Sequence, residues 1–328
     1  MTPILIAVVF LTLVFAFLNG VHDSSNVGAT MISSRAFSPR VALGVTAVAN
    51  FAGPFIFGVA VADTIGNDVV DPKTVSVAII LAALVSANLW DILTWILGLP
   101  SSSSHALVGG IVGAVVMGAG WREIHIQGLW KVLIPLFTSP AIGFIVGYIL
   151  LKLILLMSWD ATPRINSFFR HSQIVTGTAL ALSHGTNDSQ KAMGILALAL
   201  VAGGVLTSFE IPTWVIVVCA AMISLGTAIG GWRLIRTLGG KFYKIRPIDG
   251  FTSQLTSSLV IIVASLLGGP VSTTHVVSSA IMGCGTAERP NKVRWTVAEE
   301  IAIAWLLTIP ASAVVAATVY WILSRLLT

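Results

Sequence analysis

Long stretches of apolar residues alternate with short polar segments along the whole chain. The apolar stretches cover residues 3–34, 41–62, 74–98, 101–119, 129–157, 172–204, 213–230, 251–268, 271–287 and 296–324. They are continuous and rich in Leu, Ile, Val, Ala and Gly, which is typical of membrane-spanning helices. The strands of a membrane β-barrel would instead be short and alternate in polarity. The pattern therefore predicts an all-α polytopic membrane protein.

The composition excludes a soluble globular domain. Of the 328 residues 56% are hydrophobic and 9% are charged, and the mean hydropathy is +0.94. A soluble domain carries about 25% charged residues. The net charge of +5 does not indicate a nucleic-acid partner, because basic residues of membrane proteins gather in cytoplasmic loops. No basic segment precedes the first apolar stretch, so we expect it to be a true span and not a cleaved signal peptide.

Two of the apolar stretches are longer than a bilayer requires. Residues 3–34 and 172–204 both exceed the ~20 residues of a simple span. Each contains a polar, glycine-bearing segment, Asn19–Asp23 in the first and His184–Asp188 in the second. We expect both stretches to form broken helices at these segments.

The order of motifs repeats. Gly20, Asp23 and Ser24 recur 165 positions later as Gly185, Asp188 and Ser189. A second set recurs 170 positions later, namely Pro100, Ser102, His105, Ile111 and Gly113 as Pro270, Ser272, His275, Ile281 and Gly283. The chain is therefore predicted to be an internal duplication, with repeats at 1–157 and 172–328 and a cytoplasmic linker at 158–171.

The loop charges favour inverted repeats. If 74–119 and 251–287 are re-entrant helical hairpins, each repeat has three spans plus a hairpin, and the second repeat is inverted. Twelve basic residues then fall on one side: Arg35, Arg40, Arg164, Arg170, Arg233, Arg236, Lys241, Lys244, Arg246, Arg289, Lys292 and Arg294. Only Lys73, Arg122, Lys131 and Arg325 fall on the other. The positive-inside rule makes the first side cytoplasmic, so both termini are predicted outside.

The two hairpin tips carry candidate anion ligands. Each has a Pro followed by hydroxyl residues: Ser102, Ser103 and Ser104 in the first, and Ser272, Thr273 and Thr274 in the second. Such segments are good helix starts. A helix N-terminus presents N–H donors and partial positive charge, which suits an oxyanion. The alternative is that these hydroxyls only cap their own helices.

Two carboxylates, Asp23 and Asp188, lie inside apolar stretches. Each would cost about 2.5–3.5 kcal/mol at the centre of an isolated spanning helix. Asn26 follows Asp23 by three residues, and Asn187 and Gln190 flank Asp188. Carboxylate and amide oxygens are ligands that small hard cations prefer. The alternative is a polar cluster that only holds helices together.

Other polar residues of the motifs have two interpretations each. His22 and His184 titrate near neutrality and are candidate proton carriers, although a permanently neutral, hydrogen-bonded histidine is the simpler interpretation. Lys191 is expected to pair with Asp188, three residues before it, or to neutralise a substrate. Asp91 and Asn88 have no acidic counterpart in the second half, and a structural role accounts for them.

These motifs resemble the signatures of the inorganic phosphate transporter (PiT) family. The resemblance lies in residues 19–26 and 184–191 and in the tips 100–105 and 270–275, and it extends over essentially the whole chain. It implies a secondary transporter with inverted repeats, whose partners are phosphate, a coupling cation and a second copy in a homodimer. It implies no prosthetic cofactor and no enzymatic activity, and a location in the cell inner (plasma) membrane.

The resemblance also assigns residues to roles. It implies that Asp23, Asn26, Asn187, Asp188 and Gln190 form the coupling-ion region, with Asp23 and Asp188 as metal ligands if the ion is sodium. It implies that Ser102, Ser103, Ser104, Ser272, Thr273 and Thr274 bind phosphate. Many sodium-coupled members have Asn-Asp where this chain has His22-Asp23, and bacterial proton-coupled members are more similar. Sodium and proton coupling both stay open.

Three alternative functions differ in cargo or class. A sulfate permease of the same family differs only in its tetrahedral anion. A passive anion channel would conduct without coupling, which the buried Asp pair disfavours. An intramembrane hydrolase needs one nucleophile with an oriented base, whereas the hydroxyls here come in symmetric clusters.

Overall fold

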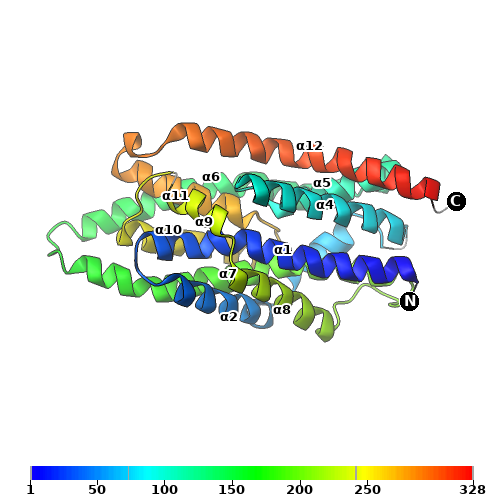
Figure 1. Ribbon diagram of the computed structural model, residues 1–328, viewed down its shortest axis with the longest axis horizontal. Coiled ribbons are helices and arrows are strands. Elements are labelled where there is room, and N and C mark those ends of the chain that lie inside the picture. Colours follow the sequence, from blue (N-terminus) through cyan, green and yellow to red (C-terminus); the bar gives the residue numbers. More distant parts are fainter. Residues whose placement is uncertain (1, 73, 241, 327–328) are drawn as a thin grey trace.

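Long helices that run roughly along a common direction make up the fold (Figure 1). The structure, a computed structural model, describes residues 2–72, 74–240 and 242–326. Lys73 and Lys241, which entered the count of loop charges, lie outside these ranges. The long helices of the first half are α1 (Pro3–Ser33), α2 (Pro39–Phe57), α4 (Val77–Leu97), α5 (Ser103–Gly118) and α6 (Ile126–Met157). Those of the second half are α7 (Ile165–Ala202), α8 (Thr213–Ile229), α10 (Pro247–Leu266), α11 (Thr273–Glu288) and α12 (Trp295–Leu326).

Short elements join the long ones. They are α3 (Ala60–Asp63), which continues into the π-helical turn η1 (Thr64–Asp68), the 3₁₀ turns η2 (Trp121–Glu123) and η3 (Pro290–Lys292), and α9 (Trp232–Gly240). Each predicted apolar stretch corresponds to one long helix, so the all-helical prediction is confirmed. Helix α9 was not predicted, because it is short and basic. Helix α7 begins at Ile165, so the predicted linker 158–171 is helical in its second half.

The prediction that the first and seventh helices are broken is wrong. Helix α1 is continuous through Asn19–Asp23, and α7 is continuous through His184–Asp188. The glycines serve close packing instead: a Cβ on Gly20 would collide with the backbone of Ile223 on α8, and one on Gly185 with the backbone of Asn50 on α2. The hydroxyls of Ser24 and Ser189 nearby bond to carbonyls of their own helices, which satisfies these buried polar groups without a break in the helix.

The helices of the two halves repeat each other in length and packing. Helices α5 and α11 both have 16 residues, and α6 and α12 both have 32. Helix α5 packs against α12, and α11 packs against α6. Likewise α4 packs on α1 and α10 on α7, while α8 packs on α1 and α2 on α7. Helices α5 and α11 therefore each lie against the last long helix of the other half.

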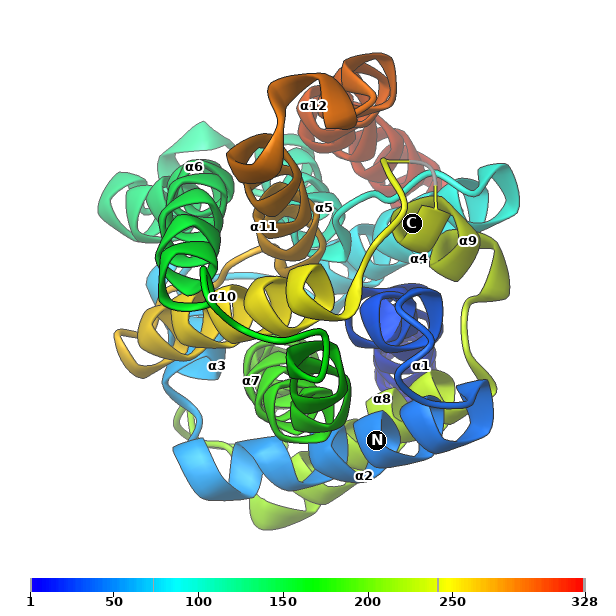
Figure 2. The same cartoon turned by 90° about the vertical axis from the view of Figure 1, so that its left-hand side faces the viewer.

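The surface of the bundle suits a membrane. Among the described residues six helices are long and apolar enough to span one, or seven if α8 and α9, bent by 70°, count as one span. The most apolar segments of α6 and α12 are only 17% and 22% buried, so their apolar side chains form much of the outer surface. Seen along the helices, α12 and α2 lie on opposite sides with α1, α7, α10 and α11 between them (Figure 2).

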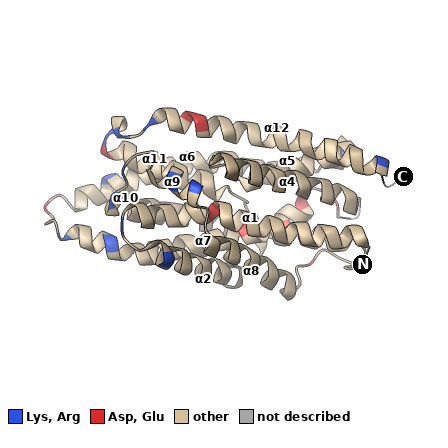
Figure 3. Cartoon of the chain, viewed as in Figure 1, with Lys and Arg blue, Asp and Glu red and all other residues tan. Residues whose placement is uncertain are grey.

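Both termini lie at the same end of the bundle (Figure 1). Figure 3 shows that most Lys and Arg positions lie near the opposite end. One group there is an ion-pair cluster, in which Asp249 and Glu288 bind Arg246 and Lys292. Burial lowers the pKa of Arg246, but Asp249 and Glu288 outweigh this and raise it above its usual value. The cluster ties the start of α10 to the end of α11.

Candidate functional site

Four segments distant in sequence meet inside the bundle. They are the middle of α1, the middle of α7, and the tips that precede α5 and α11. The N-caps of α5 and α11 are Ser102 and Ser272, and each hydroxyl accepts a hydrogen bond from the backbone N–H three residues on, at 3.2 and 3.3 Å. The two tips also touch, because the Ser104 hydroxyl donates to the Val271 carbonyl at 3.3 Å.

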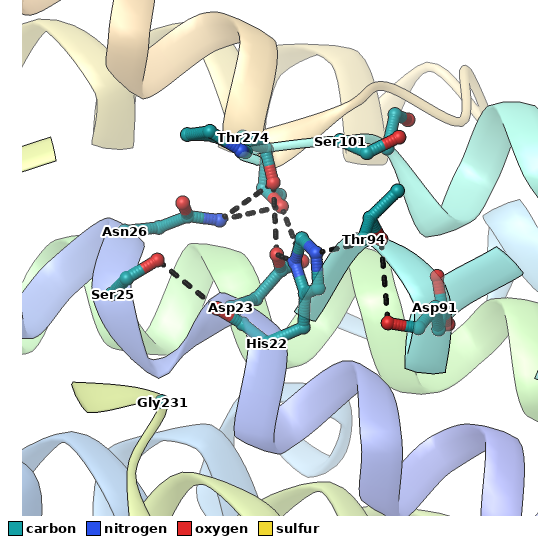
Figure 4. A network of polar contacts seen from close by, with 12 residues as sticks. His22, Asp23, Ser25, Asn26, Asp91, Thr94, Ser101, Gly231 and Thr274 are labelled. Carbon is teal, nitrogen blue, oxygen red and sulfur yellow. Dashed lines mark hydrogen bonds and ion pairs between the residues drawn. The ribbon is translucent and has the colours of Figure 1, made fainter. Parts of the chain in front are cut away.

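Asp23 and Asp188 converge on the tip of α11. The Thr273 hydroxyl lies 2.7 Å from Oδ2 of Asp188 and 3.2 Å from Oδ2 of Asp23, so the two carboxylates share one donor. The Thr274 hydroxyl donates to Oδ1 of Asp23 at 2.8 Å (Figure 4). Both carboxylates are almost completely buried. Like charges this close repel each other, so the pair needs positive charge beside it.

Two histidines stand beside these carboxylates. His184 Nε2 is 2.9 Å from Asp188 Oδ2 and 3.5 Å from Asp23 Oδ2, whereas His22 Nδ1 is 3.3 Å from Asp23 Oδ1. Ligand atoms of Asp23, His184 and Asp188 lie within 4.8 Å of one another, close enough to hold one metal ion. The predicted proton carriers and the predicted metal ligands therefore occupy one cluster.

Lys191 places a positive charge in the same cluster. Its side chain is fully buried, and its Nζ donates to Asp188 Oδ1, to Ser104 Oγ at 2.5 Å and to the Val271 carbonyl at 2.7 Å. It therefore joins α7 to both tips. The sequence indicated its pairing with Asp188 through their three-residue spacing, but its contacts with the tips depend on long-range packing.

The predicted coupling-ion residues separate into two groups. Asn26 lies in the cluster, where its Nδ2 donates to Thr273 and Thr274 hydroxyls at 3.4 and 3.2 Å. Among the described residues its Oδ1 has no hydrogen-bond partner, which leaves one free oxygen ligand there. Asn187 instead positions the second tip, because its Oδ1 accepts from Val271 N at 3.3 Å.

Gln190 is not brought to the cluster. Its Oε1 accepts from the backbone N–H groups of Val61 and Ala62 at 2.7 and 3.2 Å, and its Nε2 donates to the Gly58 carbonyl at 2.6 Å. These bonds satisfy the polar backbone where α2 ends and α3 begins. Gln190 and Asp188 are two positions apart on α7, so they point to different faces of the helix.

The predicted phosphate ligands differ in what their hydroxyls contact. Ser102 and Ser272 cap their own helices, which matches the alternative interpretation for these two. Thr273 and Thr274 donate to carboxylates, and Ser104 accepts from Lys191. In the part of the chain that the structure describes, the buried Ser103 hydroxyl makes no hydrogen bond.

The chemistry of this arrangement suits ions of both signs. Carboxylate oxygens of Asp23 and Asp188 lie close together beside the hydroxyls of Thr273 and Thr274, and a hard cation prefers such oxygen atoms. The N-termini of α5 and α11 and the Lys191 ammonium add donors and positive charge, which an oxyanion requires.

Thr94 on α4 was not identified from the sequence as a site residue. Its hydroxyl lies 3.4 Å from His22 Nε2, on the side of the ring opposite to Asp23 (Figure 4). A threonine inside an apolar stretch carries no pattern that would single it out.

Comparison with known proteins gives a consistent result. The family model described as "Phosphate transporter family" matches residues 19–316. A probable low-affinity inorganic phosphate transporter of Bacillus subtilis (strain 168) is 44% identical over 325 residues, which cover 98% of this chain and 97% of that protein. A protein of the same description from Rhizobium meliloti (strain 1021) is 43% identical over 97% of this chain and 96% of its own length.

A solved structure has the same fold. It is described as "The sodium-dependent phosphate transporter", is 26% identical in sequence, and covers 99% of this chain and 100% of its own, with a TM-score of 0.92. The relatives are named as transporters, and the apolar helices are those of a multi-pass membrane protein. The chain belongs to the phosphate transporter family.

Proposed function

We propose that this protein imports inorganic phosphate by symport with a cation, sodium or proton, through alternating access. One observation carries the proposal: Asp23 and Asp188, which correspond in the sequence repeat, meet at the hydroxyl of Thr273. The Lys191 ammonium offsets one of the two buried carboxylates, and the remaining negative charge is expensive without a bound cation or proton. Binding of the cation would also offset the negative charge of an incoming anion.

In this proposal the cation binds to the oxygens of Asp23, Asp188 and Asn26. Its arrival frees the hydroxyls of Thr273 and Thr274 from the carboxylates, so that they can turn to phosphate. Ser104 at the facing tip and the Lys191 ammonium complete the anion's surroundings. His22 and His184 carry protons if the coupling ion is a proton.

Alternating access follows from two repeats with inverted topology, at 1–157 and 172–328. The exchanged packing of α5 on α12 and α11 on α6 supports a two-fold relation between the halves. If the halves exchange conformations, the site between them opens to the other side. Helices α5 and α11 have 16 residues each and are about 24 Å long. They are shorter than the ~30 Å hydrocarbon core of a bilayer, which favours re-entrant hairpins over membrane-spanning helices.

The location and assembly belong to the same proposal. The gathering of Lys and Arg at the end opposite to both termini favours a cytoplasmic location of that end in the inner membrane, with the termini outside (Figure 3). We also expect a homodimer, whose interface would lie on the apolar outer helices.

The test is uptake of radiolabelled phosphate into proteoliposomes. Uptake is measured under a sodium gradient, and then under a proton gradient without sodium, with excess sulfate as competitor in each. We expect accumulation under at least one gradient and little competition by sulfate. Absence of phosphate uptake would refute the proposed function. Complete inhibition by sulfate would indicate that sulfate is the transported anion. Uptake that needs no gradient of either ion would indicate a passive channel.

A matched pair of threonine variants on α11 tests the site. Thr273→Ala removes the hydroxyl shared by the two carboxylates and should reduce uptake about tenfold or more. Thr286→Ala removes a hydroxyl that bonds to the Met282 carbonyl of the same helix, at 2.8 Å, and should leave uptake within about twofold. Equal effects of the two substitutions would contradict the site assignment.

A further inference from the structure

Asp91 on α4 differs from the other buried carboxylates. Four carboxylates are buried among the described residues: Asp23, Asp91, Asp188 and Asp249. Asp23 and Asp188 share the Thr273 hydroxyl, and Asp249 binds Arg246 and Lys292. Asp91 is 1% exposed, yet within the described ranges neither of its carboxylate oxygens has a hydrogen-bond partner. Its backbone carbonyl accepts from the Thr94 hydroxyl at 3.3 Å (Figure 4).

Other oxygens near Asp91 share this property. Ser103, at the start of α5, lies near the carboxylate and is 3% exposed. Asn88 lies three positions earlier on the same face of α4, and its Nδ2 donates to the Leu11 carbonyl of α1 at 3.1 Å. For the chain as described, Ser103 Oγ and Asn88 Oδ1 have no hydrogen-bond partner either.

The charged and titratable groups that face Asp91 come from α1. His22 and Asp23 are close enough to interact with it electrostatically. Thr94, one turn after Asp91 on α4, touches the His22 ring (Figure 4). His22 bonds to Asp23, so no fixed cation is paired with Asp91 in the described structure. A carboxylate left without a positive charge at this depth is costly, so it needs a proton or a metal cation.

We propose that Asp91 and Ser103 form a second site for a small monovalent cation, a proton or a sodium ion, separate from the Asp23–Asp188 pair. Asn88 supplies a further oxygen ligand from the same helix face. The site accepts a cation because its free polar atoms are oxygens, which a hard cation satisfies together. Because Asp91 is on α4 and Ser103 opens α5, an ion bound between them holds the first tip in place.

This inference rests on the proposed function, since it assigns a second coupling ion to the same transporter. The ion at Asp91 would set the position of Ser103 and Ser104, and Ser104 contacts Lys191 in the substrate cluster. Loss of the second cation should therefore weaken the link between the ion gradient and phosphate accumulation. It should affect phosphate binding itself far less.

The first experiment measures cation binding without phosphate. Binding of radioactive sodium to the purified full-length protein tests a metal cation, and the infrared band of a protonated buried carboxyl group, without sodium, tests a proton. We expect Asp91→Asn to remove one sodium site or that infrared band, and Ser103→Ala to weaken the cation affinity several-fold. Asp160→Asn, in the exposed loop after α6, controls for loss of a surface charge. If neither signal changes in Asp91→Asn, the proposal is overturned.

The second experiment separates this site from the proposed function. Proteoliposomes with equal ion concentrations on both sides report phosphate exchange, and those with a sodium or proton gradient report driven accumulation. For Asp91→Asn we expect driven accumulation to fall about tenfold while exchange stays within about twofold. Asp91→Glu should restore part of the accumulation. An equal loss of exchange and accumulation in both variants would indicate a purely structural residue. Absence of both activities in the unaltered protein would refute the function, while the binding measurements still decide the cation site.

Discussion

Replacement of Lys191 by Met tests whether the buried ion pair stabilises the fold. The substitution keeps the length of the side chain but removes the ammonium group that binds Asp188, Ser104 and the Val271 carbonyl. Removing one partner of a buried pair typically costs 3–5 kcal/mol, since the other charge stays buried. Asp188 keeps contacts with Thr273 at 2.7 Å and His184 at 2.9 Å, so we expect the low end, about 3 kcal/mol.

The assay is denaturant unfolding of the full-length protein in detergent micelles. Asp188→Asn alone should also cost about 3 kcal/mol, because it leaves the lysine unpaired. The double variant should lose about 2 kcal/mol less than the sum of the two single losses. Lys152→Met, at an exposed position of α6, should change the free energy of unfolding by no more than about 0.5 kcal/mol. Strict additivity, or a loss below about 1 kcal/mol for Lys191→Met, would refute the reasoning.

Three further predictions concern stability and need the same unfolding assay. Gln190→Leu should cost about 1–3 kcal/mol, because buried N–H groups between α2 and α3 lose their acceptor, yet the ion dependence of uptake should not change. Gly20→Ala should destabilise by about 1–3 kcal/mol through collision with α8, whereas Gly44→Ala, with open space around its Cβ, should be neutral or stabilising. Asp249→Asn should destabilise by about 3 kcal/mol, since Lys292 and Arg246 lose a buried partner; unchanged unfolding would count against the ion-pair cluster.

The features that depend on local pattern were predictable from the sequence. Continuous apolar stretches require helices in a membrane, because every backbone N–H and C=O must find a partner within its own segment. The starts of α5 and α11 were marked by Pro100 and Pro270 followed by hydroxyl residues. Asp23 and Asp188 stood out because a carboxylate in an apolar stretch is costly, and the repeat placed them in corresponding positions.

Features that depend on helix packing could be decided only by the tertiary structure. A glycine beside polar residues can break a helix or allow a neighbouring helix to pack closely, and the sequence does not distinguish the two. The close approach of α8 to Gly20 shows that this glycine allows close packing. Gln190 and Asn26 are both amides in polar motifs, but they lie on helix faces with different neighbours. Gln190 bonds to the backbone at Gly58, whereas Asn26 bonds to Thr273. Asp91 shows the same limit. That its carboxylate oxygens have no partner in the described chain is visible only in the packed structure, because sequence spacing does not specify which donors a buried group can reach.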